Sequence, residues 1–166
     1  MSELLLLCRS KRQTHSLGRW LGKLFIAGDW LGLTGELGAG KTCLVQGIAQ
    51  GLEVGEGVQV SSPTFVIHQM IPGRLLMHHL DLYRVESLDQ LAELGYEEFL
   101  DSGGVCVVEW CEIVPESIPG RGVIASIELL DEKTRQIRMR ALDERGRALI
   151  GQIRRRCAAY VRERWK

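Results

Sequence analysis

The chain has 166 residues, of which 45% are hydrophobic and 25% are charged, and its formal net charge is zero. This composition is that of a globular domain. It excludes a disordered chain, and no apolar run is long enough for a membrane span. The net charge is zero because two segments of opposite charge cancel. Residues 1–132 hold 9 basic and 18 acidic side chains, whereas residues 133–166 hold 12 basic and 3 acidic ones. A uniformly basic nucleic-acid-binding protein is therefore excluded, but a basic surface at one end is not.

Short apolar runs alternate with segments of helical periodicity along the chain. Taken in order, they predict a strand at 4–8, a helix carrying 17–25, a strand at 30–34, a helix at 41–52, a strand at 75–81, a helix at 88–94, strands at 105–110, 124–130 and 135–142, and a basic helix at about 147–164. Thr14 or Ser16 is the expected N-cap of the first helix, and Ser87 that of the third. This order predicts a single α/β domain over residues 1–166, with a mostly parallel central sheet, antiparallel edge strands and helices on both faces.

The turn after the second predicted strand fits the phosphate-binding pattern G-x-x-x-x-G-K-[ST] in full. Its residues, all candidates for nucleotide contact, are Gly35, Glu36, Leu37, Gly38, Ala39, Gly40, Lys41 and Thr42. Glycines let the backbone N–H groups approach phosphate oxygens closely, and the N-terminus of the next helix adds a positive dipole. We expect Lys41 to contact the β- and γ-phosphates and Thr42 to bind Mg²⁺, which indicates a P-loop NTPase domain.

Two predicted strands end on acidic residues, as a Mg²⁺-nucleotide site requires. Glu109 follows four apolar residues, and Asp81 ends the strand at 75–81. Both acids would lie at the carboxyl edge of a parallel sheet, beside the phosphate loop. Since Mg²⁺ takes one or two carboxylates, one acid would hold the metal while the other acts through water or orients the attacking water. The sequence does not decide which acid holds the metal and which acts on water. For each acid, the alternative is a solvated strand end without a role in catalysis.

The sequence S-P-T-F at 62–65 lies between the phosphate-loop helix and the next strand. Many nucleotide switches have a threonine there that contacts the γ-phosphate. Position alone leaves Thr64 open between that role and a turn fixed by proline.

The five cysteines lack the spacing of disulfide or metal pairs, so we expect free thiols in a reducing compartment. The leucine run at 4–7 is too short for the core of a signal peptide, and basic residues follow it instead of preceding it. We therefore expect a cytoplasmic protein without membrane association. His78 and His79 would point to opposite faces of a strand and are expected to be structural.

Four motifs follow one another along the chain: T-G-E-L-G-A-G-K-T at 34–42, S-P-T-F at 62–65, H-x-D-L-Y-R at 79–84 and E-W at 109–110. Together they resemble the bacterial TsaE (YjeE) family, ATPases that assist threonylcarbamoyladenosine formation on tRNA. The resemblance covers roughly residues 5–130. The phosphate loop is shared with many NTPases, whereas the ordered set is far more specific.

The resemblance implies a weak ATPase that uses ATP and Mg²⁺ and acts on the TsaB and TsaD proteins. These transfer threonylcarbamoyl to adenosine 37 of tRNAs that read ANN codons. By the same resemblance, Lys41 and Thr42 bind phosphate and Mg²⁺, and Glu109 is the metal-associated acid. Asp81 is similar to the second essential acid, and Thr64 to the switch threonine.

Three further residues are weaker candidates. Thr14, in the family's opening T-x-x-L-G, is assigned to nucleotide binding, and Trp110 and Arg84 to contact with a base or a partner. The alternative for Trp110 is an aromatic that covers a strand end, and the alternative for Arg84 is pairing with nearby acids on a helix surface. The chain departs from the family in Cys111, where proline is usual, and in the segment 67–70, which lacks the usual aromatic ending.

The basic end, residues 133–166, matches no motif of the family. Its arginines at 154–156, 162 and 164 surround the apolar stripe of the last predicted helix. They form either a solvated helix face or a surface that contacts tRNA phosphate or an acidic partner.

Two other function classes use a similar loop. A small-molecule kinase of the shikimate- or nucleoside-kinase type usually has its first strand directly before the phosphate loop, and it needs an arginine-bearing lid. Here a strand and a helix come first, and residues 115–132 hold only Arg121. A nucleotide-switched binding module with negligible turnover would use the same loop, with Thr64 sensing the γ-phosphate.

Overall fold

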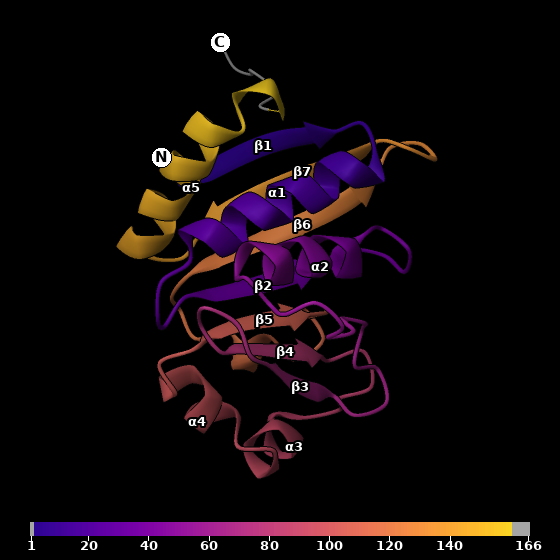
Figure 1. Ribbon diagram of the computed structural model, residues 1–166. Coiled ribbons are helices and arrows are strands. Elements are labelled where there is room, and N and C mark those ends of the chain that lie inside the picture. Colours follow the sequence, from indigo (N-terminus) through magenta and orange to yellow (C-terminus); the bar gives the residue numbers. More distant parts are fainter. Residues whose placement is uncertain (1, 161–166) are drawn as a thin grey trace.

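A mixed seven-stranded sheet with strand order β1-β7-β6-β2-β5-β4-β3 runs through the computed structural model, which describes residues 2–160 (Figure 1). The strands are β1 (Glu3–Cys8), β2 (Trp30–Thr34), β3 (His68–Ile71), β4 (Met77–Asp81), β5 (Val105–Glu109), β6 (Val123–Leu129) and β7 (Arg135–Ala141). β2 pairs in parallel with β5 and β6, and β4 pairs in parallel with β5, whereas β1–β7, β6–β7 and β3–β4 are antiparallel. The predicted parallel centre with antiparallel edges is confirmed.

Helices pack on both faces of this sheet. They are α1 (Lys11–Leu24), α2 (Lys41–Gly51), α3 (Leu88–Glu93), α4 (Tyr96–Asp101) and α5 (Glu144–Arg156), with 3₁₀ turns η1 (Pro115–Ser117) and η2 (Ala158–Tyr160). α1, α2 and α5 lie over one face, at the front of Figure 1. Alternation along β5 explains the two layers, because Val105 and Val107 join the main core while Cys106 and Val108 join a second core on the other face. α3 and α4 contribute to that second core.

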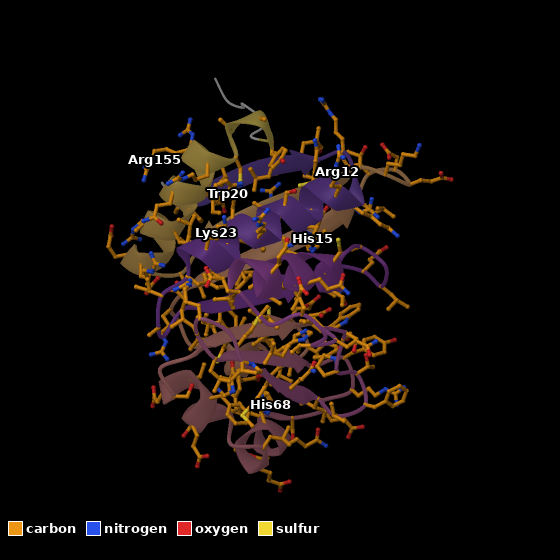
Figure 2. All side chains as sticks on the ribbon, viewed as in Figure 1. Arg12, His15, Trp20, Lys23, His68 and Arg155 are labelled. Carbon is orange, nitrogen blue, oxygen red and sulfur yellow. The ribbon has the colours of Figure 1, made fainter. Side chains whose placement is uncertain are left out.

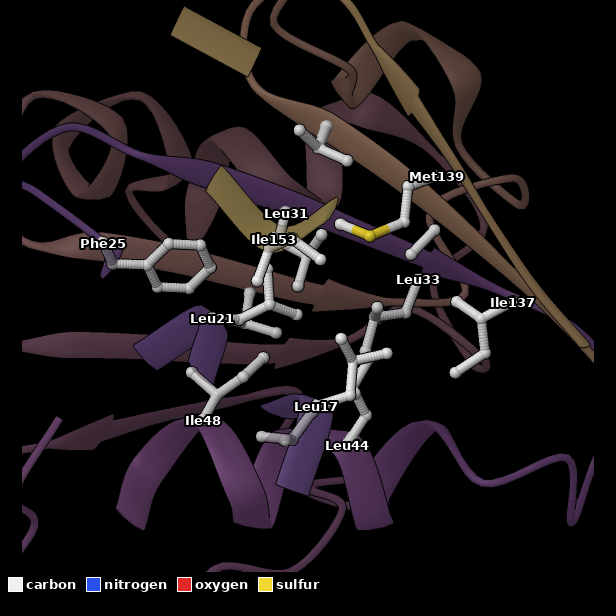
Figure 3. Packing of buried hydrophobic residues seen from close by; sticks show 14 of the residues in the cluster. Leu17, Leu21, Phe25, Leu31, Leu33, Leu44, Ile48, Ile137, Met139 and Ile153 are labelled. Atoms are coloured by element: carbon white, nitrogen blue, oxygen red, sulfur yellow. The ribbon is translucent and has the colours of Figure 1, made fainter. Parts of the chain in front are cut away.

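The main core forms where the three helices meet the sheet. Figure 3 shows Leu17 and Leu21 of α1 and Leu44 and Ile48 of α2 packed beneath the strands, together with Ile153 of α5. All are at most 1% exposed. Since α2 begins directly after the phosphate loop, burial of its apolar face fixes the loop against the sheet.

The N-terminal boundary of α1 differs from the prediction. Ser10 caps the helix through its Oγ, which accepts a hydrogen bond from the backbone N–H of Gln13 at 3.2 Å. Thr14 and Ser16 were both wrong as caps. Thr14 is fully buried within the helix, where its hydroxyl donates to the carbonyl of Ser10 at 3.4 Å.

The last helix is also displaced from its predicted span. α5 begins at Glu144, because Asp143 caps it by accepting from the backbone N–H of Gly146 at 2.7 Å. It ends at Arg156, and a 3₁₀ turn at Ala158–Tyr160 follows. Residues 161–164 of the predicted helix lie outside the described residues.

All five cysteines are free thiols, as expected. Within residues 2–160, no helix combines the length and apolar character needed to cross a membrane.

Glycines let α1 and α2 cross in backbone contact. Gly18 and Gly22 of α1 face Gly47 and Gly51 of α2. A Cβ atom at Gly47 would lie 2.1 Å from the carbonyl oxygen of His15, and one at Gly22 would lie 2.2 Å from that of Ile48. No flexible side chain can move aside to relieve these clashes, so the crossing requires glycine.

We therefore expect Gly47→Ala to destabilise the protein by about 3 kcal/mol, because the two helices must separate. The matched control is Gly151→Ala on α5, where a Cβ would meet only a side-chain nitrogen of Arg155 at 3.8 Å. Alanine there should stabilise the protein by about 0.5 to 1 kcal/mol through its helix propensity. Urea denaturation of both variants measures the difference, and equal stabilities would contradict the close helix crossing.

Candidate nucleotide-binding site

The phosphate loop joins β2 to α2, as its sequence pattern requires. Gly35, Gly38 and Gly40 have φ angles of 131°, 80° and 113°, which L-residues with side chains rarely adopt. A Cβ at Gly35 would also lie 2.2 Å from the carbonyl oxygen of Ile127 on β6. The loop can therefore curl tightly only because glycine occupies these positions.

Lys41, the first residue of α2, is only 5% exposed. Its Nζ donates to the backbone carbonyls of Gly35 and Glu36, the latter at 3.0 Å, and lies 3.6 Å from the centre of the Trp110 ring. Burial lowers the pKa of this ammonium group, while nearby carboxylates, Glu109 foremost, act in the opposite direction. The charge is thus held against the loop itself.

Glu109 and Asp81 lie side by side at the ends of β5 and β4, in parallel register, and each is 2% exposed. Both carboxylate oxygens of Glu109 lie 3.2 Å from the hydroxyl of Thr42. Glu109 Oε1 also accepts from Nε2 of His79 at 2.9 Å. Within residues 2–160, the buried Nδ1 of His79 has no hydrogen-bond partner. Both acids therefore lie at one edge of the sheet, beside the phosphate loop.

Asp81 contacts the segment 62–65. Its Oδ2 accepts from the hydroxyls of Ser62 and Thr64, the latter at 3.2 Å, and its Oδ1 accepts from the backbone N–H of Tyr83 at 2.9 Å. Ile67, with φ of 64°, holds the turn through its carbonyl, which accepts from the backbone N–H of Asp81 at 2.9 Å. A β-branched residue at positive φ is strained, and such strain gathers at functional sites.

Lys41, Thr42, Asp81 and Glu109 line one cavity of about 430 Å³. Of the predicted site residues, the cavity is lined by Thr14, Leu37, Gly38, Gly40, Lys41, Thr42, Thr64, Asp81, Glu109 and Trp110. Gly35, Glu36, Ala39 and Arg84 are outside its lining.

The sequence interpretation missed several lining residues, among them Lys11, Cys43, Gln46 and Arg135. Lys11 comes from the start of α1 and Arg135 from the start of β7. Arg135 is 4% exposed, and its Nε, which has no hydrogen-bond partner in the part of the chain that the structure describes, lies 3.6 Å from where a Cβ of Gly40 would be. No local pattern points to these two cations, because only the tertiary fold brings them to the loop.

Comparison with known proteins decides the family. A family model described as threonylcarbamoyl adenosine biosynthesis protein TsaE matches residues 8–139. The chain belongs to the TsaE family. It is 39% identical over 129 residues to the tRNA threonylcarbamoyladenosine biosynthesis protein TsaE of Treponema pallidum, covering 78% of this chain and 94% of that protein. The corresponding protein of Bacillus subtilis is 33% identical over 144 residues, covering 86% and 89%.

The fold agrees with a solved structure. The crystal structure of Bacillus subtilis YdiB superposes with a TM-score of 0.78 at 28% identity, covering 95% of this chain and 98% of that chain. The similarity therefore extends over the whole TsaE-family domain, beyond the motifs at residues 34–110.

Trp110 of this TsaE-family chain has a φ of 61°, so its backbone is in the left-handed region. Its ring contacts Lys41, and its centre lies 5.0 Å from the centre of the Tyr83 ring. Arg84 instead places its guanidinium 4.7 Å from the centre of the exposed Phe65 ring. Cys111, the departure from the family pattern, is fully buried in the second core and does not line this cavity.

The donor set fits Mg²⁺ held together with a nucleotide. Among the described residues, no group of three or more His, Cys, Asp or Glu side chains is arranged to hold a metal without help. Mg²⁺ keeps several waters and uses one or two carboxylates with phosphate oxygens. The Thr42 hydroxyl and the carboxylates of Glu109 and Asp81, gathered beside the loop, meet that requirement.

Proposed function

We propose that this chain binds and hydrolyses Mg-ATP to support threonylcarbamoyl transfer to adenosine 37 of ANN-decoding tRNAs, acting on a TsaB–TsaD complex in the cytoplasm. The observation that carries the proposal is the convergence of Lys41, Thr42, Glu109 and Asp81 on one cavity at the phosphate loop. Membership of the TsaE family supports the pathway.

Lys41 would bind the β- and γ-phosphates after leaving the carbonyls of Gly35 and Glu36. Thr42 and Glu109 would hold Mg²⁺, since the Thr42 hydroxyl already lies 3.2 Å from both Glu109 oxygens. The bound metal supplies charge stabilisation to the phosphate oxygens. His79 would keep Glu109 in place, because an ionised carboxylate only accepts hydrogen bonds and the Nε2–H of His79 donates one.

Asp81 is our candidate for orienting the attacking water. Its Oδ2 faces the hydroxyls of Ser62 and Thr64, so a nucleotide that draws Thr64 away would free that oxygen for water. The water oxygen would then bond to the γ-phosphorus as the bond to the ADP oxygen breaks. Thr64 would act as the switch that reports the γ-phosphate.

The arrangement also accounts for weak activity without a partner. Lys41 is engaged by its own loop and by Trp110, and Asp81 by Ser62 and Thr64. A partner that draws Trp110 away would release Lys41 for phosphate. Partner contact through Trp110 and Arg84 is therefore part of the proposal.

A small-molecule kinase is less well supported. The arginine that a lid would need, Arg121, donates to the carbonyl of Leu100 at 2.7 Å and lies 3.7 Å from Asp101. Both partners belong to α4, away from the phosphate loop. A binding module with negligible turnover would share the same site and differs only in the rate of hydrolysis.

Capture of the TsaB–TsaD complex by this chain, with and without ATP, tests the partner assignment. We expect capture that depends on ATP and weakens when Trp110 and Arg84 are both changed to alanine. A matched control is Arg138→Ala with Leu129→Ala, which removes one arginine and one apolar side chain at exposed positions away from the cavity. Absence of capture under both nucleotide conditions would contradict the proposal.

A further inference from the structure

α1 presents a basic stripe to solvent. Arg12, Arg19 and Lys23 are exposed at spacings of seven and four residues, so they lie on one side of the helix. Residues 4–28 contain no acidic side chain. The stripe from Arg12 to Lys23 is about 16 Å long at the rise of an α-helix.

The last turn of α5 continues this stripe. Trp20 joins the two helices, because its ring lies 5.2 Å from Nζ of Lys23 on one side and 5.3 Å from the guanidinium of Arg156. Figure 2 shows Arg12, Trp20 and Lys23 of α1 on the same side of the molecule as Arg155 of α5. We define the α1–α5 basic face as Lys11, Arg12, Arg19, Lys23, Arg155 and Arg156.

No residue of the α1–α5 basic face forms an ion pair with an acidic side chain among residues 2–160. This differs from the arginines nearer the start of α5, since Arg145 pairs with Asp29 at 2.6 Å and Arg147 with Glu144 at 2.5 Å. The face therefore carries uncompensated positive charge, although the whole chain is neutral.

Helix electrostatics explains only half of this charge. Arg155 and Arg156 lie in the last turn of α5 and Lys23 lies in the last turn of α1, where cations stabilise the negative end of the helix dipole. Lys11 and Arg12 lie in the first turn of α1, which has no acidic residue, and there cations oppose the positive end. An anion bound from outside the chain would stabilise Lys11 and Arg12 at this end of the helix.

The chemistry of the face indicates a polyanion. Protein interfaces usually have a large apolar or aromatic anchor at their centre, and neither α1 nor α5 carries an exposed large hydrophobic side chain. A row of exposed, unpaired cations suits the repeated phosphates of a nucleic acid. Lys11 also lines the nucleotide cavity, so the row begins at the site itself.

We propose that the α1–α5 basic face binds the phosphate backbone of RNA. That the RNA is a tRNA rests on the proposed function. That the face binds an RNA backbone rests only on its unpaired positive charge. The sequence placed the basic surface at the C-terminal end alone. The structure extends it to α1, whose cations are far from that end in the sequence.

The test compares two variants with the same loss of charge. Arg12→Gln with Arg19→Gln removes two cations of the face, and glutamine keeps a high helix propensity. Arg138→Gln with Arg140→Gln is the control. These arginines are exposed on β7, and their neighbours Ile137 and Met139 point into the main core beneath α1, so the control pair lies on the opposite side of the sheet. Binding of an unmodified tRNA transcript decoding an ANN codon is measured by fluorescence anisotropy over a series of KCl concentrations.

We expect the α1 variant to bind tRNA about tenfold more weakly at 0.1 M salt, with the slope of log affinity against log salt reduced by about 1.5. The control should stay within about twofold of the unaltered chain. Equal losses in both variants, or no RNA binding by the unaltered chain, would overturn the inference. Binding to phosphatidylglycerol vesicles in place of tRNA would overturn it as well.

ATP hydrolysis measured on the same preparations separates the two proposals. Hydrolysis without RNA binding overturns only the basic-face inference. RNA binding without hydrolysis leaves the basic face intact and contradicts the proposed function.

Discussion

Lys41→Ala should lower the rate of ATP hydrolysis by about a thousandfold, equivalent to about 4 kcal/mol of transition-state stabilisation. Lys41 is the buried cation at the start of α2, and its Nζ is held by the carbonyls of Gly35 and Glu36. In a site shielded from water, a fixed positive charge stabilises developing charge on the phosphate oxygens strongly. Alanine keeps the helix and removes that charge.

The matched control is Lys133→Ala, which removes an exposed lysine from the turn between β6 and β7. Phosphate release under saturating ATP gives the rates, and thermal unfolding checks that both variants are folded. Hydrolysis by Lys41→Ala within tenfold of the unaltered chain would show that the loop does not serve as we propose.

Glu109→Gln and Asp81→Asn should each lower single-turnover hydrolysis by at least about a hundredfold, while affinity for ATP changes only a few-fold. Each substitution keeps the shape of the side chain and removes its charge. An amide oxygen at position 109 can still accept from Thr42, so the loop should keep its geometry. The loss should therefore appear in the chemical step more than in binding.

Glu116→Gln is the control for these two variants, because Glu116 is exposed on η1 and outside the cavity. Nucleotide affinity is measured with a fluorescent ATP analogue, and hydrolysis in a single turnover. Turnover that survives both acid substitutions would mean that the acids are wrongly assigned.

The phosphate loop and its two acids were predictable because each depends on local sequence. An apolar strand that is buried throughout ends at Glu109, a second buried strand ends at Asp81, and parallel pairing brings these two strand ends together. The opposite orientations of His78 and His79 were predictable for the same reason. The alternation of side chains along a strand does not predict the hydrogen-bond partner of His79. In the structure His79 contacts Glu109 and is more than a packing residue of the core.

Other features depend on tertiary structure that no short pattern encodes. Arg135 reaches the loop because β7 is inserted between β1 and β6. The glycine crossing of α1 and α2 requires knowing which helix faces pack together. The cap of α1 was misassigned because Ser10, Thr14 and Ser16 all have a hydroxyl near the helix start. The structure shows that Ser10 has the extended backbone of an N-cap.

Two short elements also escaped prediction. β3 has only four residues and is half-exposed, so its periodicity is weak. α4 has six residues and begins after Gly95 in the left-handed conformation, directly after α3. Segments this short carry too few apolar positions to show a period.

Single-turnover hydrolysis of ATP by this chain, with and without the TsaB–TsaD complex, tests the proposed function most directly. We expect slow, Mg²⁺-dependent phosphate release by the chain alone and acceleration of about tenfold or more by the complex. Lys41→Ala should show neither. Binding of ATP without phosphate release, in the presence as well as the absence of the complex, would contradict the proposed ATPase and leave a nucleotide-switched binding module in its place.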